Sequence, residues 1–197
     1  MNGSIVVPTG SGEHPDTEKQ YDAILGRCRE LFLNKFKDYG ASWRVMRPTA
    51  ITDQIFIKAQ RIRSVQESGQ NLVNESLRGE FIGIVNYGIM GLVQLDHGYN
   101  NTPNEERAEL LAWYDTYAQM SRNLMLTKNH DYGEAWRSMR ISSITDIILQ
   151  KVFRTKQIEE NRGEVSVSEG IDANYLDMIN YALFALILIE EGCDPMQ

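Results

Sequence analysis

The sequence DYGASWRVMR at Asp38–Arg47 returns as DYGEAWRSMR at Asp131–Arg140, an offset of 93 residues. Matching residues continue on both sides of this segment, at Tyr21 and Tyr114, Lys35 and Lys128, Ile51–Asp53 and Ile144–Asp146, and, after one inserted residue, Asn86 and Asn180. Trp, Tyr and Gly residues that keep one offset over such a length are typical of an internal duplication. The chain is therefore expected to contain two copies of one supersecondary unit.

Each copy contains three segments with helical patterns, and neither shows sustained strand alternation. The expected helices are Thr17–Lys37, Ile51–Glu67 and Asn74–Leu95 in the first copy, and Pro103–Asn129, Ile144–Asn161 and Ser168–Glu191 in the second. The predicted fold class is all-α, with two tandem three-helix repeats packed about a pseudo-twofold axis as one helical bundle. The predicted boundaries are a flexible tail at 1–16, a first repeat at 17–98 and a second repeat at 99–197.

Local signals mark the ends of these helices. Capping boxes at Thr102–Glu105 and Ser166–Glu169 predict helix starts in the second repeat. Ser142–Ser143 offers cap residues for the helix between them. Gly40 and Gly133 follow the first helix of each repeat, where a left-handed residue is favoured.

Composition and charge limit the classes of function. The 197 residues include 20 Lys or Arg and 27 Asp or Glu, which gives a net charge of −7. This balance disfavours duplex nucleic acid as a partner, because such binding depends on many phosphate contacts. Cys28 and Cys193 are expected to be free thiols in a cytoplasmic protein, since no secretion signal is visible. The longest apolar stretch, Tyr175–Ile189, is too short for a membrane span, so a buried helix is expected.

The repeated Asp-Tyr-Gly-x-x-Trp motif allows two interpretations. Tyr132 and Trp136 of the second copy can enclose a nucleobase by stacking, while Asp131 contacts a polar edge of that base. Alternatively, the glycine ends the helix and the two aromatic rings fasten the loop to the core. Tyr39 and Trp43 of the first copy allow the same two interpretations.

Two cationic pairs occupy equivalent predicted helices. Lys58 and Arg61 in the first copy are three residues apart, as are Lys151 and Arg154 in the second. This spacing places both members of a pair on one helix face. Each pair is a candidate for binding the phosphate oxygens of a ligand. The alternatives are a solvated basic stripe or ion pairs with neighbouring carboxylates.

Asp177 lies within the apolar helix predicted near the C-terminus. A carboxylate in such surroundings is costly unless a cation or a metal ion accompanies it. Its expected partner is Lys151 or Arg154, or a bound Mg²⁺ that Glu169 also ligates. The first copy has Gly83 at the equivalent position, so the two repeats are not chemically equivalent.

On these motifs the chain resembles the nucleotide modification associated domain 1 family in its tandem form. The second copy carries the family pattern at Asp131-Tyr132-Gly133, Trp136, Lys151, Arg154, Glu169, Asp177, Asn180 and Tyr181. The resemblance implies an all-α protein that handles nucleotides. The candidate substrate-binding residues are Asp131, Tyr132, Trp136, Lys151, Arg154, Asn180, Lys58 and Arg61, and the candidate metal ligands are Glu169 and Asp177. A more distant likeness is to the MazG-like all-α NTP pyrophosphohydrolases, whose Glu-Glu-x-x-Glu cluster is absent from this sequence.

Two hypotheses of function follow. The first is binding or processing of a small-molecule nucleotide, extending to Mg²⁺-dependent hydrolysis of a nucleoside triphosphate. The alternative is a non-enzymatic helical scaffold or partner-binding module, in which Asp177 pairs with a cation as a structural bridge. No membrane partner is expected. The chain is expected to be a monomer or a homodimer, because the duplication can supply within one chain what a dimer supplies elsewhere.

Overall fold

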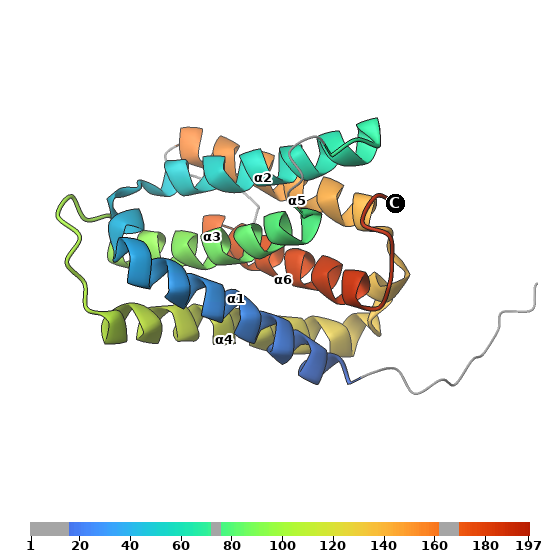
Figure 1. Ribbon diagram of the computed structural model, residues 1–197, viewed down its shortest axis with the longest axis horizontal. Helices are drawn as coiled ribbons and strands as arrows, with labels where there is room; N and C mark the ends of the chain where they lie inside the picture. The colour runs from blue at the N-terminus through green and yellow to red at the C-terminus, as the bar shows by residue number, and fades with distance from the viewer. Residues whose placement is uncertain (1–15, 72–75, 162–169) are drawn as a thin grey trace, which may run out of the picture.

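The computed structural model describes residues 16–71, 76–161 and 170–197. These ranges form six α-helices: α1 (Thr17–Tyr39), α2 (Pro48–Ser68), α3 (Leu77–His97), α4 (Arg107–Tyr132), α5 (Ile141–Glu160) and α6 (Ile171–Glu190) (Figure 1). Short 3₁₀ turns, η1 (Ser42–Val45) and η2 (Ala135–Ser138), follow α1 and α4. The described ranges contain no strand. The all-α prediction, with three helices in each of two tandem repeats, is confirmed.

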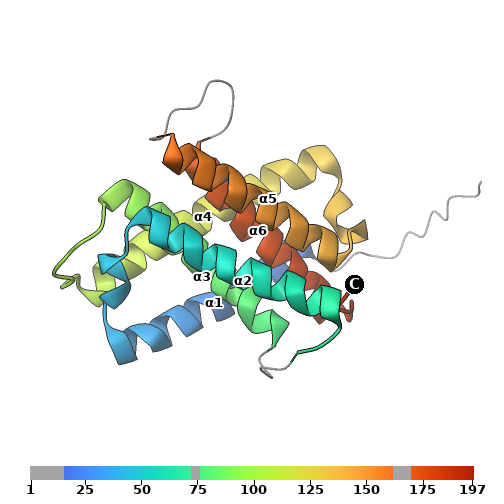
Figure 2. The ribbon, with the colours of Figure 1, turned by 90° about the horizontal axis from the view of Figure 1, so that it is seen from above.

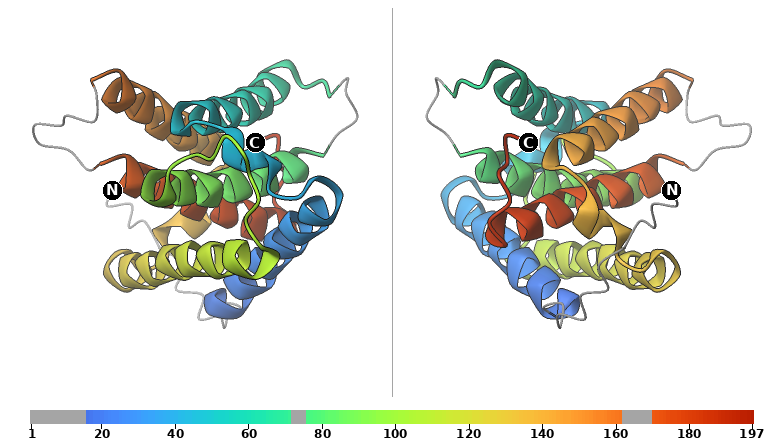
Figure 3. Two further views of the ribbon diagram at one scale, coloured as in Figure 1. Left: turned by 90° about the vertical axis from the view of Figure 1, so that its left-hand side faces the viewer. Right: turned by 90° about the vertical axis from the view of Figure 1, so that its right-hand side faces the viewer.

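The six helices form three layers, and each layer holds one helix from each repeat (Figure 1, Figure 3). α3 and α6 pack along each other in the middle layer. The pair α2 and α5 covers one side of that layer, and the pair α1 and α4 covers the other. Because both sides of the middle layer are covered, α3 and α6 are apolar almost throughout, while the outer helices keep a polar face.

Two glycines bring α3 and α6 close together. A Cβ atom at Gly88 would lie 2.6 Å from Ile179 Cγ1, and one at Gly91 would lie 2.7 Å from Tyr175 Cζ. Any side chain at these two positions would push the helices of the middle layer apart. Gly88 and Gly91 therefore serve helix packing and do not belong to a phosphate-binding loop.

α6 is the helix among the described residues that is long and apolar enough to cross a membrane by length and composition. Its apolar window is 72% buried inside the bundle. A core helix passes the same test, because all of its faces meet other helices. The buried helix predicted at Tyr175–Ile189 is therefore confirmed.

The outer layer of α1 and α4 is joined by reciprocal ion pairs. Arg29 of α1 donates to both carboxylate oxygens of Asp115 of α4, at 2.7 and 2.8 Å. Arg122 of α4 donates to both carboxylate oxygens of Asp22 of α1, at 2.6 and 3.0 Å. At the repeat offset of 93 residues, each bond is the counterpart of the other. A pseudo-twofold arrangement produces this reciprocity, although the axis itself stays a prediction.

Three predicted helix starts are wrong, and those at Asn74 and Ser168 lie outside the described residues. α2 begins at Pro48 and not at Ile51, because proline is well suited to the first position of a helix. α4 begins at Arg107 and not at Pro103, because Glu105 of the predicted capping box pairs with Arg44, whose side chain is only 3% exposed. α5 begins at Ile141, so Ser142–Ser143 lies inside the helix and caps nothing. The box at Ser166–Glu169 falls in the undescribed range 162–169. The glycine ends of α1 and α4 are confirmed, since both glycines adopt a φ of 58°.

The two cysteines are free thiols, as predicted, and they differ in burial. Cys28 is buried in the core, and this burial raises the pKa of its thiol to about 12. Cys193 is exposed. We expect a thiol-specific alkylating reagent at pH 8 to modify only Cys193 in the native protein and both residues after unfolding, because the thiolate is the reacting form. Mass spectrometry checks this, and a native Cys193→Ser variant that still incorporates the reagent would contradict it.

Candidate functional site

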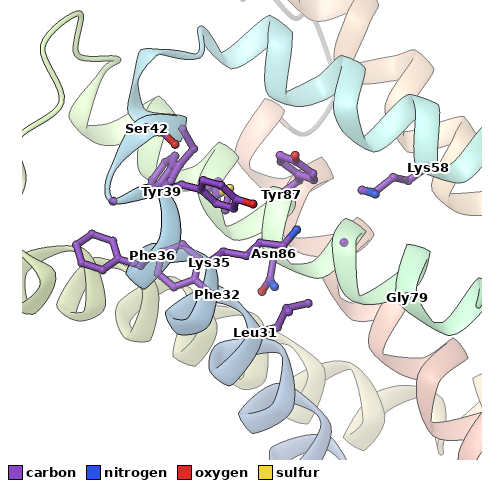
Figure 4. Close-up of a pocket in the computed structure, with 14 residues that line it drawn as sticks. Leu31, Phe32, Lys35, Phe36, Tyr39, Ser42, Lys58, Gly79, Asn86 and Tyr87 are labelled. Atoms are coloured by element: carbon purple, nitrogen blue, oxygen red, sulfur yellow. The ribbon is translucent and has the colours of Figure 1, made fainter. Parts of the chain in front are cut away.

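Each repeat contains a pocket beside the end of its first helix. The second-repeat pocket has a volume of about 400 Å³ and is lined by Met125, Lys128, Asn129, Tyr132, Ala135, Trp136, Met139, Asp177, Asn180, Tyr181 and Phe184. The first-repeat pocket has a volume of about 320 Å³ and is lined by Leu31, Phe32, Lys35, Phe36, Tyr39, Gly40, Ser42, Trp43, Lys58, Gly79, Gly83, Asn86, Tyr87 and Met90 (Figure 4). Most of these positions match at the repeat offsets, so the duplication produced two versions of one pocket.

The two pockets lie far from each other. α1 and α4 run in opposite directions in the lower layer of Figure 1, and the view from above agrees (Figure 2). The C-terminal ends of these two helices therefore point to opposite ends of the molecule. Because each pocket adjoins one of these ends, each can hold a ligand of its own.

Asp177 is the charged centre of the second-repeat pocket. Its side chain is 6% exposed, and its Oδ1 and Oδ2 atoms lie 2.5 Å from the ammonium groups of Lys128 and Lys151, respectively. Burial acts to raise the pKa of Asp177, but the hydrogen bonds and charges of the two lysines outweigh it and lower that pKa. Asp177 is therefore an ionised carboxylate held between two cations from α4 and α5.

Of the two cations expected to pair with Asp177, Lys151 contacts its carboxylate and Arg154 does not. Arg154 is half-buried on α5 and makes no hydrogen bond or ion pair with another residue of the described ranges. Lys128 was missed as a partner, although the repeat alignment pairs it with Lys35 one helix turn before each Tyr-Gly motif. The alignment marked the position, but only the packing of α4 on α6 showed that its side chain meets Asp177.

Among the described residues, the oxygens of Asp177 face cations and no metal-binding cluster adjoins them. Each of its oxygens already contacts an ammonium group, and no cluster of three or more His, Cys, Asp or Glu side chains occurs among the described residues. Glu169, the other candidate ligand, lies outside those residues. Mg²⁺ stays a prediction of the sequence.

Asn180 forms the inner wall of the second-repeat pocket, with its amide committed to the protein. Its Oδ1 accepts hydrogen bonds from the Tyr21 hydroxyl at 2.7 Å and from Ser121 Oγ at 2.9 Å, and its Nδ2 donates to the Ser121 carbonyl at 3.1 Å. Tyr21 belongs to the first repeat, so this bond joins the repeats. The equivalent bond also exists in the opposite direction: the hydroxyl of Tyr114, in the second repeat, donates to Oδ1 of Asn86, in the first repeat, at 2.8 Å.

The aromatic residues of the motif divide between core and surface. Trp136 stacks on Phe184 with ring centroids 4.3 Å apart, and the Arg137 guanidinium lies 4.5 Å from the Trp136 centroid. With a ring on one side and a cation close to it, Trp136 serves the packing of the pocket wall. Tyr132 is 72% exposed at the rim of the pocket, so its ring is open to a ligand. Asp131 is exposed and does not line the pocket.

The cationic pair of the first repeat meets a different acid. Lys58 Nζ lies 3.1 Å from Glu80 Oε2, and an Arg61 guanidinium nitrogen lies 2.5 Å from Glu80 Oε1. Glu80 is one helix turn before Gly83, the position that matches Asp177. The acid has therefore moved by one turn of α3, and it lies outside the lining of the first-repeat pocket.

The comparisons with known proteins agree with this repeat structure. The model of the family described as nucleotide modification associated domain 1 matches residues 35–95 and 128–189, which together are more than half of the chain. A comparison with curated proteins finds no match, and neither does a comparison with solved structures. The two matched segments contain most residues of both pockets and confirm the tandem form. The chain belongs to the nucleotide modification associated domain 1 family.

Proposed function

We propose that the chain binds a nucleotide and that the second-repeat pocket receives its base and sugar. The family name supports a role connected with nucleotides. The observation that carries the proposal is the exposed ring of Tyr132 beside the fixed charges of Asp177 and Lys128, in one pocket of about 400 Å³. That volume lies within the range of about 300–1,000 Å³ that small-ligand pockets occupy.

The chemistry of the lining suits a nucleobase. A base has a flat apolar face and a polar edge, and the pocket offers both kinds of contact. Tyr132, Tyr181 and Phe184 supply aromatic surface for the face. The Lys128 ammonium is a donor and the Asp177 carboxylate is an acceptor, so the polar edge can meet both.

These residues support binding and not hydrolysis. A metal ion on Asp177 would have to displace Lys128 or Lys151, and each is 2.5 Å from a carboxylate oxygen. Hydrolysis of a nucleoside triphosphate with Mg²⁺ therefore stays a prediction of the sequence. Measuring phosphate and pyrophosphate release from nucleoside triphosphates with Mg²⁺ tests it directly.

One observation favours the scaffold alternative as a second candidate function. Asp177 contacts its cations directly, as a structural bridge does. A scaffold has no need for the pocket beside that bridge, however, or for a tyrosine exposed at its rim. Ligand binding therefore distinguishes the two functions.

The substitution Tyr132→Ala is expected to weaken binding of a nucleoside monophosphate by about 5- to 10-fold, because stacking on an aromatic side chain contributes about 1 kcal/mol or more. Calorimetric titration with a panel of nucleosides and nucleoside monophosphates measures the effect. Asp131→Ala is the matched control, since Asp131 is the exposed neighbour and does not line the pocket. Equal affinity of Tyr132→Ala and wild type, or no binding across the panel, would contradict the proposal.

A further inference from the structure

The two pockets carry different charge. The second-repeat pocket is lined by one lysine and one aspartate, so its lining charges cancel. The first-repeat pocket is lined by Lys35 and Lys58, and none of its lining residues is acidic. Half of the difference comes from Gly83, which occupies the position of Asp177, and half from Lys58, whose counterpart Lys151 does not line the second-repeat pocket. The lining of one pocket is thus electrostatically balanced, while the lining of its counterpart carries two cations, of which Lys58 also pairs with Glu80 outside the lining.

Gly83 also decides where Lys58 lies. A Cβ atom at Gly83 would be 2.5 Å from Lys58 Cε and 2.6 Å from Lys58 Cδ. The lysine side chain therefore passes directly over the bare backbone of α3, in space that a side chain would fill. Its ammonium group reaches the pocket 5.9 Å from the centre of the Tyr87 ring. Figure 4 shows Lys58 extending from α2 toward Tyr87.

Lys35 supplies the second cation. It comes from α1, on the side of the pocket opposite α2, and in Figure 4 its side chain extends toward Asn86 and Tyr87. Lys35 makes no ion pair with another residue of the described ranges. Its counterpart Lys128 is bound to Asp177, so the glycine leaves Lys35 available for an anion that enters from solvent.

Trp43 adds an independent indication of a ligand. Its indole N–H is buried and has no hydrogen-bond acceptor within the described residues. The counterpart N–H of Trp136 donates to Asn129 Oδ1 at 3.1 Å, but the first repeat has Phe36 in place of that asparagine. Both Phe36 and Trp43 line the first-repeat pocket. A buried donor without an acceptor is costly, and a ligand that displaces the pocket wall at Trp43 would satisfy it with an oxygen atom.

We propose that the first-repeat pocket is a second binding site, specific for a ligand that carries a phosphate group. Lys35 and Lys58 contact the phosphate oxygens from two sides, and the Trp43 N–H donates to an oxygen of the ligand. Tyr39, 69% exposed at the rim, covers the ligand. The site stands on its own residues and does not depend on what the second-repeat pocket binds.

Titration calorimetry at low ionic strength tests the site with inorganic pyrophosphate as the probe. The wild-type chain is expected to bind it despite a net charge of −7, which opposes unspecific binding of anions. Lys35→Gln is expected to weaken binding about 10-fold, the usual effect of losing one charge-assisted hydrogen bond. Lys37→Gln is the matched control, because Lys37 has the same charge on the same helix but does not line the pocket.

Gly83→Asp is the second variant, because it gives the first repeat the aspartate of the second. The new carboxylate would lie beside Lys58, whose flexible end can move aside, and is expected to abolish pyrophosphate binding. A parallel titration with a nucleoside and its triphosphate identifies the source of the phosphate. Stronger binding of the triphosphate than of pyrophosphate indicates a nucleotide, and equal binding indicates the inorganic ion.

Three results would overturn the site: no binding of pyrophosphate or triphosphate by wild type, unchanged binding by both pocket variants, or equal losses in Lys35→Gln and Lys37→Gln. Failure here is distinguishable from failure of the nucleotide proposal. The nucleotide proposal is tested by how Tyr132→Ala binds nucleosides and nucleoside monophosphates. The phosphate site is tested by how the first-repeat variants bind an inorganic probe.

Discussion

Replacing Asp177 by alanine is expected to lower the free energy of unfolding by about 3 kcal/mol, near the lower end of the range for breaking a buried ion pair. The carboxylate is almost fully buried and accepts from two ammonium groups. Lys151 is only 12% exposed, so water replaces the lost carboxylate poorly. Lys128 is 43% exposed and regains water more easily, which keeps the loss from being larger.

Urea unfolding followed by circular dichroism measures this loss. Asp115→Ala is a suitable control, because Asp115 also binds a cation across two helices but lies at the surface. Exposed pairs contribute about 0–1 kcal/mol, so the control variant is expected to stay close to wild type. An Asp177→Ala variant as stable as Asp115→Ala would show that the carboxylate is not what holds α4 and α5 to α6.

The same carboxylate predicts a pH dependence. The pKa of Asp177 is lowered in the folded chain, while an unfolded aspartate has a pKa of about 3.9. A lowered folded pKa means that the unfolded state takes up the proton first as pH falls. The stabilisation is therefore complete above about pH 4 and is lost as pH falls through the lower folded pKa. Urea unfolding of wild type and Asp177→Asn from pH 6 to 3 is expected to show a stability difference that shrinks only in the acidic part of the range.

Much of the fold follows from the sequence because the repeat fixes the number and order of the helices. Gly88 and Gly91 fit this pattern, since a glycine inside an apolar helix indicates close backbone approach. Helix starts were less predictable. The residues Thr102–Glu105 have the pattern of a capping box, but the Glu105 carboxylate pairs with the buried guanidinium of Arg44 and does not cap the helix. A contact over 61 residues in sequence outweighed a local preference.

One part of the candidate site was predictable from the sequence, because a carboxylate in an apolar helix needs a cation beside it. Asp177 in an apolar helix required a cation, and Lys151 on the preceding helix supplies one. The choice between the two interpretations of Trp136 was not predictable, because its ring is covered by Phe184 from α6, a residue with no polar signal. Tyr132 was equally ambiguous, since the motif does not say which aromatic ring faces solvent.

The hydrogen bonds between the two repeats could not be predicted from the sequence either. Tyr21 and Tyr114 occupy matching positions in the two repeats. That match does not indicate that the hydroxyl of each tyrosine donates to the asparagine of the other repeat. Burial raises the pKa of both tyrosines far above the usual value, so both hydroxyls stay protonated and donate. Asn180, predicted as a ligand contact, lines the second-repeat pocket and also joins the two repeats through the Tyr21 hydroxyl.

Asn180→Ala is accordingly expected to destabilise the chain by about 2–3 kcal/mol, because it leaves a cavity and removes the acceptor of the Tyr21 hydroxyl. Tyr21→Phe is expected to cost about 1 kcal/mol, the net value of one buried hydrogen bond. The double variant is expected to lose about 1 kcal/mol less than the sum, since the two residues share that bond. Asn123→Ala on the exposed side of α4 is the control and is expected to change stability by less than about 0.5 kcal/mol.

The shape of the unfolding curve shows whether the two repeats unfold together or separately. Asn180 lies on α6 of the second repeat and Tyr21 on α1 of the first, so weakening their bond acts on both repeats at once. If the three layers fold as one unit, Asn180→Ala shifts a single cooperative transition to lower urea, with the same slope as wild type. Two separate transitions in this variant, or additive losses in the double variant, would show that each repeat is stable without its partner. Because every layer pairs a helix of one repeat with a helix of the other, we expect the single transition.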